Sequence, residues 1–199
     1  MKVLTIYAHP NRESFNHAVL DCFTRGLKEG GHNIDVVDLY EIGFDPCFRL
    51  EDFNQYTGGP LPPDVVAQQE KVAWADALAF IAPVWWMHFP AILKGWVERV
   101  FTYNFAYMMT DDGWKGDVKD RVGLLKHKRT LIITTTFFSE ENYKQKGLED
   151  AMRKIVDEYG FQYPGIKDVQ HVYFYAVSAV DDETRKKYLD TAYRLGKEF

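Results

Sequence analysis

Residues 85–88 read Trp-Trp-Met-His, four side chains that together can hold a flat aromatic ligand. Residues 77–82 before them form a short apolar run of strand length, and apolar side chains after Pro90 recur with the period of an amphipathic helix. Pro90 itself suits the first helical position. The four residues therefore lie in a loop at the carboxyl end of a strand, where open α/β sheets bind ligands. The pattern is equally compatible with aromatic residues that cover a sheet edge or form a dimer interface.

A second loop, residues 9–16, connects an expected strand at 3–8 to the start of an expected helix. Free backbone N–H groups at a helix start favour an anion such as a phosphate. Ser14 and Asn16 add side-chain donors, and Arg12 adds positive charge. Taken alone, Ser14 is more simply a helix N-cap and His9 a structural histidine. The chain has neither a Gly-x-Gly-x-x-Gly fingerprint nor a P-loop, which excludes those two kinds of nucleotide site.

A third loop follows an expected strand at 130–136. Residues 134–139 read Thr-Thr-Thr-Phe-Phe-Ser, and Tyr143 lies beyond them. Because the carboxyl ends of parallel strands share one edge of a sheet, we expect the three loops to converge. An anion-binding helix start, an aromatic wall and a hydroxyl-rich strand end together suit a phosphate attached to a flat heterocycle. A flavin nucleotide has that chemistry.

The other elements follow from apolar periodicity and turn residues. Strands are expected at 34–39 and 171–177, and helices from Phe15 to near Gly30, over 64–74, over 90–101, over 148–159 closed by Gly160, and from Asp182 onward. Residues 40–63 read as irregular and 102–128 as mixed. Five strands alternating with five helices predict a doubly wound five-stranded parallel sheet in a single α/β domain spanning 1–199. Periodicity does not reveal the strand order.

Composition limits the classes of function. The chain has 199 residues, a net charge of −5 and 46% hydrophobic residues, which is ample material for a core and argues against binding nucleic acid. No apolar run approaches the roughly 20 residues that span a bilayer, and no signal-peptide core precedes the first strand. Cys22 and Cys47 lack a disulfide or metal-binding pattern, so reduced thiols, a cytoplasmic location and no metal site are expected.

The most specific motif in the chain is Pro83-x-x-Trp86-x3-Pro90-Ala-Ile-Leu-Lys-Gly-Trp96-x-Glu98-Arg-Val100. It is accompanied by His9-x4-Ser14-Phe-Asn16, by Leu61-x-Pro63-Asp-x-Val-Ala67, by Phe105-Ala-Tyr107, and by Thr135-Thr136 followed by Tyr143 and Gly147. On these motifs, which span nearly the whole chain, the sequence resembles the flavodoxin-like NAD(P)H:quinone oxidoreductases, the family of DT-diaphorase and its bacterial relatives.

The resemblance implies a flavodoxin-like fold with strand order 2-1-3-4-5 and a homodimer with two flavin sites at the subunit interface. The cofactor residues it implies are His9, Ser14, Phe15 and Asn16 at the phosphate end, Pro83, Val84, Trp85, Trp86 and Met87 along the isoalloxazine, and Thr135, Thr136, Phe137 and Phe138 along its other edge. Tyr143 would approach the pyrimidine side as the catalytic residue. Tyr107, with Ala106 and Met108, would reach into the partner's substrate pocket. Lys94, Glu98 and Arg99 are read as a solvated or interface helix face without chemistry.

Two departures from the family concern the expected flavin site. Phe137 and Phe138 stand where relatives carry Gly-Gly, so their rings are expected to narrow or reshape the pocket. Glu149 stands where the animal enzymes place a histidine, and a carboxylate stabilises an anionic reduced flavin poorly unless its pKa is raised. We therefore expect Glu149 to point away, leaving Tyr143 and backbone dipoles to stabilise that charge. The flavin, FAD or FMN, and the donor, NADH or NADPH, stay open.

The resemblance implies a flavoprotein oxidoreductase with a ping-pong mechanism. NAD(P)H would pass a hydride to the flavin and leave, and a quinone or similar flat acceptor would then take its place and receive two electrons. The alternative is a regulatory, nucleotide-sensing flavoprotein subunit of a membrane transporter, with no membrane insertion of its own. A flavodoxin-type electron carrier is less well supported, because the tryptophan loop and Tyr107 suggest an enclosed pocket for a second ligand.

Overall fold

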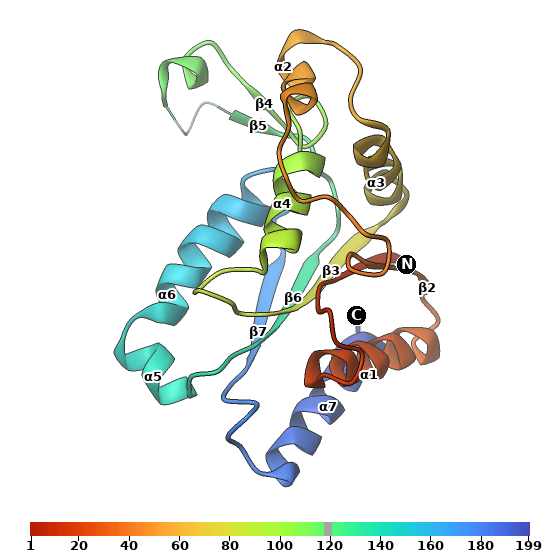
Figure 1. Ribbon diagram of the computed structural model, residues 1–199, viewed down its shortest axis with the longest axis vertical. Coiled ribbons are helices and arrows are strands. Elements are labelled where there is room, and N and C mark those ends of the chain that lie inside the picture. Colours follow the sequence, from red (N-terminus) through yellow and green to blue (C-terminus); the bar gives the residue numbers. More distant parts are fainter. Residues whose placement is uncertain (118–120) are drawn as a thin grey trace.

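A computed structural model of the chain describes residues 1–117 and 121–199. At its centre, parallel strands form one sheet in the order β2-β1-β3-β6-β7, which Figure 1 shows running through the middle of the molecule. These strands are Lys2–Tyr7 (β1), Asn33–Asp38 (β2), Ala77–Pro83 (β3), Thr130–Thr135 (β6) and Val169–Phe174 (β7). Counted along the chain, the observed order is the predicted 2-1-3-4-5, so the prediction of a doubly wound parallel sheet is confirmed.

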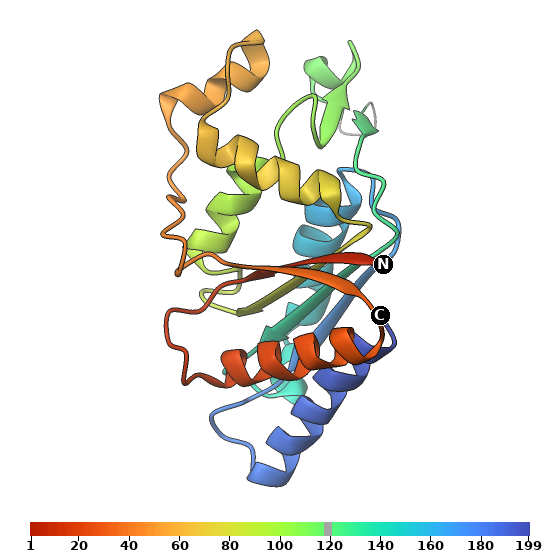
Figure 2. The same cartoon turned by 90° about the vertical axis from the view of Figure 1, so that its right-hand side faces the viewer.

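Helices cover both faces of this sheet, as the side view in Figure 2 shows. One face carries α1 and α7, and the other carries α3, α4 and the pair α6 and η3. Their bounds are Phe15–Glu29 (α1), Pro63–Trp74 (α3), Ala91–Val100 (α4), Leu148–Met152 (α6), Arg153–Gln162 (η3) and Asp182–Lys197 (α7). Because both faces are covered, each needs its own apolar layer.

The central strand β3 supplies both layers. All of its residues are buried. Leu78 and Phe80 pack into the core under α4, whereas Ala79 and Ile81 pack into the core under α1 and α7. Alternate side chains of a strand point to opposite faces, so a strand covered on both sides is apolar at every position. That explains why residues 77–82 read as an unbroken apolar run.

Helices α1 and α7 approach each other closely because two glycines face the contact. A Cβ atom on Gly26 would lie 2.1 Å from the carbonyl oxygen of Tyr193, and one on Gly196 would lie 2.2 Å from the carbonyl oxygen of Phe23. No larger residue fits at either position without moving a backbone. The close contact fixes the carboxyl-terminal half of α1 against α7.

Several short elements lie in stretches where the sequence showed no periodicity. The irregular stretch 40–63 contains Leu50–Phe53 (η1) and Asn54–Thr57 (α2), and α5 spans Glu140–Gln145. The mixed stretch 102–128 contains the antiparallel pair Tyr107–Met109 (β4) and Arg121–Gly123 (β5), with Gly113–Lys115 (η2) between them. Elements of three to six residues are too short for a helical or strand period to repeat.

Some predicted boundaries were wrong. The helix expected to close at Gly160 instead continues past it, because η3 has π-helical geometry, in which Tyr163 N–H donates to the carbonyl oxygen of Glu158 five residues back at 2.9 Å. The last sheet strand runs over Val169–Phe174 rather than 171–177. Pro90 is the N-cap of α4 rather than its first residue, with an extended ψ of 146°.

No helix among the described residues is long and apolar enough to cross a bilayer.

The 16-residue α7 has acidic side chains in its first turn and basic ones in its last, an arrangement that complements the helix dipole. Cys22, which is part-buried, and Cys47, which is exposed, are not joined in a disulfide.

Candidate functional site

A cavity of about 240 Å³ opens at the carboxyl edge of the sheet, where β1, β3 and β6 end. We call it the rim cavity. Its lining consists of His9, Ser14, Phe15, Asn16, Pro83, Val84, Trp85, Thr135, Thr136, Phe137, Val177 and Ser178. The three loops expected to converge therefore meet in one place. Of the residues expected to hold a cofactor, all but Trp86, Met87 and Phe138 line this cavity.

The amino end of α1 meets the rim cavity at Ser14, its N-cap residue. Ser14 Oγ accepts the N–H of His17 at 3.2 Å, and the first turn carries no acidic side chain. An anion at this end would meet backbone N–H donors and the positive end of the helix dipole. Arg12 instead pairs with Glu41 at 2.8 Å on the exposed surface, so its charge is shared with that carboxylate.

Asn16 connects two of the loops and leaves one polar atom unsatisfied. Its side-chain nitrogen donates to Thr135 Oγ1 at 2.8 Å. Its amide oxygen is buried and has no hydrogen-bond partner among the described residues. Buried polar atoms without partners are rare and unfavourable in folded proteins. A bound ligand that donates a hydrogen bond, such as one with a hydroxyl group, would satisfy this oxygen.

The aromatic loop is a tight turn with Trp86 and Met87 at its tip. Trp85 and His88 exchange two backbone hydrogen bonds, at 2.9 and 3.1 Å. The tip residues have φ values of 50° and 57°, in the left-handed region that such turns require and that Asn-Gly normally occupies. For residues other than glycine this conformation costs roughly 1–2 kcal/mol each. Strain of this kind gathers at functional sites.

The same turn corrects the expectation of a continuous aromatic wall. Only Trp85 lines the rim cavity, with its ring centroid 5.8 Å from that of His9. Trp86 is 100% exposed and Met87 is 39% exposed, so both project from the edge of the cavity. The physical reason is the two-residue turn that connects Trp85 to His88. Its two tip residues, Trp86 and Met87, have left-handed backbone conformations and lie outside the paired backbone of the turn.

Phe137 and Phe138 stand differently at the end of β6. Phe137 lines the rim cavity although it is 75% exposed, so its ring stands at the mouth. The carbonyl oxygen of Phe138 accepts both the hydroxyl of Thr136 at 2.7 Å and the N–H of Ala176 at 3.1 Å. These bonds fix the backbone, and the Phe138 ring does not line the cavity. One ring, rather than two, therefore narrows the mouth.

Tyr143, the expected catalytic residue, is fully buried in α5 behind the ends of β6 and β7. Its ring centroid lies 5.8 Å from that of Tyr173 and 5.4 Å from that of Tyr175. Its hydroxyl has no hydrogen-bond partner among the described residues, and burial raises its pKa. The residue does not line the rim cavity. Its catalytic role stays a prediction.

Glu149 is half-buried beside this tyrosine group. Burial raises the pKa of Tyr175, and the nearby carboxylates of Glu149 and Glu140 raise it further. Glu149 does not line the rim cavity. Its negative charge therefore acts on the tyrosines behind the cavity.

A second cavity of about 240 Å³ lies between α4 and η3. Tyr107 lines it, whereas Ala106 is fully buried and Met108 is 40% exposed and neither joins the lining. Thus, of the three expected substrate-pocket residues, Tyr107 borders this second cavity and the other two do not. His88 also lines it: its Nδ1 accepts the N–H of Phe89 at 2.8 Å, and burial lowers its pKa, so the neutral ring carries its proton on Nε2.

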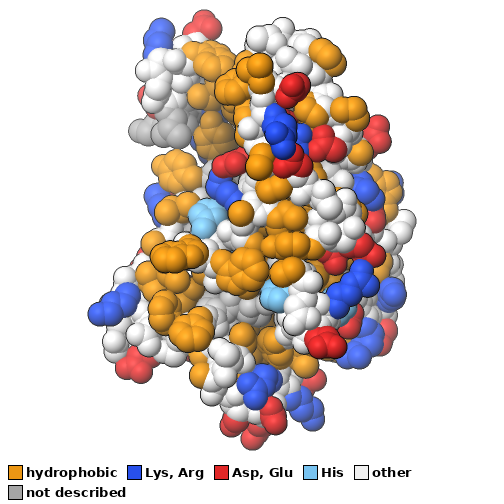
Figure 3. Space-filling view, in the orientation of Figure 1, with side chains coloured by type: hydrophobic (Ala, Val, Ile, Leu, Met, Phe, Trp, Pro, Cys, Tyr) orange, Lys and Arg blue, Asp and Glu red, His pale blue; other side chains and the backbone are white. Residues whose placement is uncertain are grey.

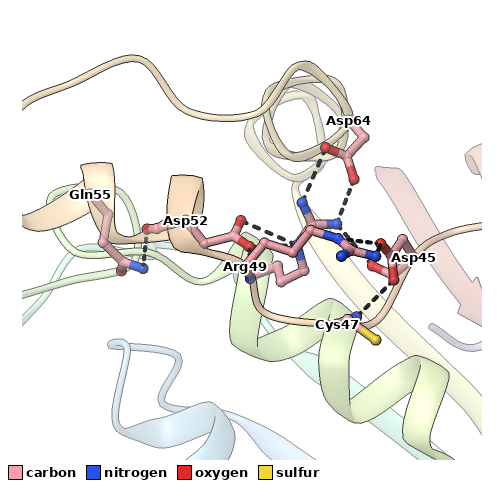
Figure 4. Close-up of polar contacts among 7 residues, drawn as sticks. Asp45, Cys47, Arg49, Asp52, Gln55 and Asp64 are labelled. Atoms are coloured by element: carbon pink, nitrogen blue, oxygen red, sulfur yellow. Dashed lines mark hydrogen bonds and ion pairs between the residues drawn. The ribbon is translucent and has the colours of Figure 1, made fainter.

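Arg99 corrects another expectation, because it is only 3% exposed rather than solvated. Its Nε donates to both oxygens of Asp52 at 3.1 Å, and its Nη1 donates to Asp64 at 2.5 Å. Figure 4 shows these carboxylates converging from the 45–64 segment and from α3. Arg99 follows the buried Trp96 by three residues, so it lies on the inward side of α4, where only a carboxylate partner makes burial tolerable.

Sequence reasoning assigned no site role to several residues that line the two cavities. Val177 and Ser178 border the rim cavity, and Tyr159 and Tyr163 border the second one. Ligands bind beyond the carboxyl ends of strands. This rule would have identified Val177 and Ser178 if the predicted last strand had ended at residue 174. No sequence signal reveals the tyrosines, because their placement depends on the π-helical turn.

Comparison with known proteins agrees with this geometry. A sequence profile of the flavodoxin-like fold family matches residues 1–195. The chain is 33% identical over 193 residues to an uncharacterized NAD(P)H oxidoreductase of Haemophilus influenzae, covering 96% of this chain and 92% of that protein. It is 34% identical over 172 residues to NAD(P)H dehydrogenase [quinone] 1 of Cavia porcellus, covering 78% of this chain but only 60% of that protein.

A solved structure extends the likeness to three dimensions. The NAD(P)H:quinone oxidoreductase from Methanothermobacter marburgensis superposes with a TM-score of 0.89 at 34% identity, covering 99% of this chain and 98% of that chain. Sequence and fold thus agree over essentially the whole chain. The chain belongs to the flavodoxin-like family that includes the NAD(P)H:quinone oxidoreductases.

Proposed function

We propose that this protein is a flavin-dependent NAD(P)H:quinone oxidoreductase that binds FAD or FMN in the rim cavity. The observation that carries the proposal is the rim cavity itself, where a helix start, an aromatic loop and a threonine-rich strand end meet. The buried, unpartnered oxygen of Asn16 supports a ligand with hydrogen-bond donors at this point. The names of the relatives agree with this class of reaction.

Different residues of the rim cavity would bind different parts of the cofactor. Ser14 and the first N–H groups of α1 would bind its phosphate, and Asn16 would accept a hydrogen bond from its polar chain. Trp85 would flank the ring, with Thr135 and Phe137 along the opposite side. A bound flavin supplies the hydride chemistry, whereas the protein supplies orientation and electrostatics.

We further propose a ping-pong cycle in which one stacking position serves both substrates in turn. Trp86 and Met87 project beside the mouth, where they would flank a nicotinamide or a flat quinone. Tyr143, buried with a neutral hydroxyl, would donate a hydrogen bond toward the pyrimidine side. Phe137 at the mouth would favour flat acceptors over bulky ones.

We also propose a homodimer. Figure 3 shows hydrophobic side chains gathered over the middle of the face that carries α4. Exposed apolar residues include Trp86, Phe137, Ile155 and Tyr159, at 100%, 75%, 58% and 50% exposure. Patches of this kind usually mark interfaces. Sedimentation velocity should give a particle of twice the 23.2 kDa chain mass, and a monomer at micromolar concentration would remove this proposal.

The test of function uses the purified protein. Its absorbance spectrum should show a bound flavin, and chromatography of the released cofactor should identify FAD or FMN. NADH or NADPH should bleach that spectrum, and a quinone should restore it. Steady-state rates plotted as double reciprocals should give parallel lines, as ping-pong kinetics require. A protein that neither retains nor rebinds either flavin would contradict the assignment.

The alternative, a nucleotide-sensing subunit of a membrane transporter, gains no support from the relatives compared above. It differs in a measurable way. Slow quinone reduction by the isolated protein, together with tight binding to a membrane protein, would favour it.

A further inference from the structure

A basic cavity of about 410 Å³ lies at the other end of the sheet, and we call it the lysine pocket. Its lining consists of Gly123, Leu125, Lys126, His127, Lys128, Gly165 and Lys167. This lining, drawn from the described residues, contains three lysines and no carboxylate, although the whole chain has a net charge of −5. Its volume is within the range of small-molecule sites.

The lysine pocket is separate from the rim cavity. Residues 123–128 lead into β6 and residues 165–167 precede β7, so the pocket lies at the amino edge of the sheet. In Figure 1 the chain enters β6 from the side of β5 and leaves it toward α5, beyond the rim cavity. The six residues of β6 span roughly 20 Å, and this length of strand separates the two cavities.

One wall of the pocket is closely packed backbone. The N–H of Leu125 donates to the carbonyl oxygen of Pro164 at 2.9 Å. A Cβ atom on Gly123 would lie 2.5 Å from the Cα atom of Gly165, which itself has a φ of 115°. Larger residues would therefore separate the two segments. A wall that is fixed before binding loses little conformational entropy when a ligand binds.

The charges of the three lysines are not balanced within the pocket. Their side chains are exposed and form no ion pair among the described residues. Asp168 pairs with Arg129 at 3.6 Å rather than with a pocket lysine. Asp76 accepts the N–H of Lys2 at 2.8 Å, which lowers its pKa, and the charge of Lys128 lowers it further. Asp76 thus offsets part of one charge, and the pocket keeps an excess of positive charge that favours an anion.

His127 adds a buried polar atom without a partner. Its Nε2 lies 2.9 Å from the carbonyl oxygen of Val72, which can only accept, so Nε2 carries the ring proton. Burial lowers the pKa of His127, which favours the neutral ring. Nδ1 is therefore an acceptor, and it is buried with no hydrogen-bond partner among the described residues. A ligand that satisfies Nδ1 must donate a hydrogen bond.

We propose that the lysine pocket binds a small phosphate oxyanion that carries a proton, with inorganic pyrophosphate at neutral pH as the probe. The lysine ammonium groups would bind its charged oxygens. Its P–O–H group would donate to Nδ1 of His127. Three lysines and a cavity of about 410 Å³ favour two phosphate groups over one. The inference does not depend on the proposed function, because it concerns the opposite edge of the sheet.

Sulfate separates the two parts of this recognition. At neutral pH sulfate carries two charges and no proton, so it satisfies the lysines but not Nδ1, whereas inorganic phosphate satisfies both. The pocket should therefore bind phosphate about tenfold more tightly than sulfate, since sulfate leaves a buried acceptor unpaired. Pyrophosphate should bind more tightly than either.

Calorimetric titration of the full chain at constant ionic strength measures these affinities, and NMR shift mapping locates the site. Pyrophosphate should shift the amide signals of residues 123–128 and 165–167. Residues 14–17 are the competing location, because the start of α1 also suits a phosphate. ADP distinguishes the sources of the ligand. Tighter binding of ADP than of pyrophosphate would identify a nucleoside diphosphate, and weaker binding would identify the free oxyanion.

Two variants test the two parts separately. The double variant Lys126→Gln with Lys167→Gln should weaken pyrophosphate binding about tenfold and weaken sulfate binding as well. His127→Gln can still donate to Val72 through its amide nitrogen but lacks Nδ1, so it should lose the preference for phosphate over sulfate. The matched control is the double variant Lys28→Gln with Lys186→Gln, two exposed helix lysines, which should bind like the unaltered protein.

Four results would overturn the inference. One is the absence of heat and of signal shifts at about 10 mM pyrophosphate. Another is a set of shifts confined to residues 14–17. The third is equal weakening in the pocket and control double variants, which would indicate attraction to surface charge in general. The fourth is an unchanged preference for phosphate in His127→Gln, or no such preference in the unaltered protein.

Discussion

The rim cavity and the Arg99 cluster, which consists of Arg99, Asp52 and Asp64, both contain buried polar side chains. They differ in whether those side chains have hydrogen-bond partners. Arg99 is 3% exposed and finds carboxylate partners in Asp52 and Asp64. At the rim cavity, the amide oxygen of Asn16 is buried without a partner among the described residues. The first region is complete by itself, whereas the second lacks what would complete it.

The two regions also differ in their backbone conformation. The Arg99 cluster holds the 45–64 segment against α4 through well-formed ion pairs. The rim carries Trp86 and Met87 in the left-handed region, one of them fully exposed. Local rules that are broken at one place and obeyed at another distinguish a functional site from a structural anchor. The predictions below test whether stability and binding separate along this line.

Arg99→Met should give the largest effect on stability. It leaves the buried Asp52 carboxylate without an ion-pair partner, with the backbone N–H of Arg49 still donating to it at 2.7 Å. The free energy of unfolding should therefore fall by about 3–5 kcal/mol in urea denaturation. Lys94→Met, on the part-exposed side of the same helix, removes only the pair with Glu98 and should cost less than about 1 kcal/mol. Equal losses in the two variants would mean that burial does not determine how much Arg99 contributes to the free energy of unfolding.

Asn16→Ala should act mainly on binding. We expect flavin affinity to fall about 10- to 100-fold, because the ligand loses a buried acceptor. The apoprotein should lose less than about 1 kcal/mol, since one of the two polar atoms removed was unsatisfied. Titration followed by flavin fluorescence measures the affinity, and Thr24→Ala on the same helix is the control. A large loss of stability with unchanged affinity would erase the distinction between the two regions.

Tyr143→Phe should slow flavin reduction about tenfold, or ~1.4 kcal/mol, with smaller loss of flavin affinity. Because burial raises the pKa of Tyr143, its contribution to stability is full below about pH 10 and is lost as the unfolded phenol ionises above that pH. Because the Tyr143 hydroxyl is buried without a hydrogen-bond partner among the described residues, its removal should leave the stability at neutral pH at least unchanged. In alkali the unaltered protein becomes less stable as its unfolded phenol ionises, so there the variant should be the more stable of the two. Stopped-flow kinetics measure the rate of flavin reduction, and urea unfolding at neutral pH and above about pH 10 measures the stability. Unchanged reduction rates would remove the role assigned to Tyr143.

Met87→Gly should give the smallest effect, a gain of about 0.5–1 kcal/mol in the free energy of unfolding. Glycine adopts positive φ without the steric cost that a side chain meets. Met87→Ala keeps that cost and should show no gain. Thermal denaturation of the two variants measures the difference. A gain in stability together with a loss of quinone reduction would identify the strain as part of the site.

Much of the site could be predicted from local sequence. The loops after the first, third and fourth sheet strands were placed at one edge because parallel strands share a direction, and their residues line one cavity. The inward orientation of Arg99 was not predictable, because its partners Asp52 and Asp64 lie far away in the chain. The same holds for Val177, whose place depends on where β7 ends.

The sequence by itself determined the sheet, its helices and the family, since apolar period and short motifs are local properties that survive without knowledge of contacts. Only the tertiary structure decided which residues of those motifs line the cavity and which project from it. It also decided the pairing of His171 with Asp157 and Thr134, three residues from three elements. Hydrogen bonds between distant segments depend on how elements pack, and no pattern along the chain encodes that directly.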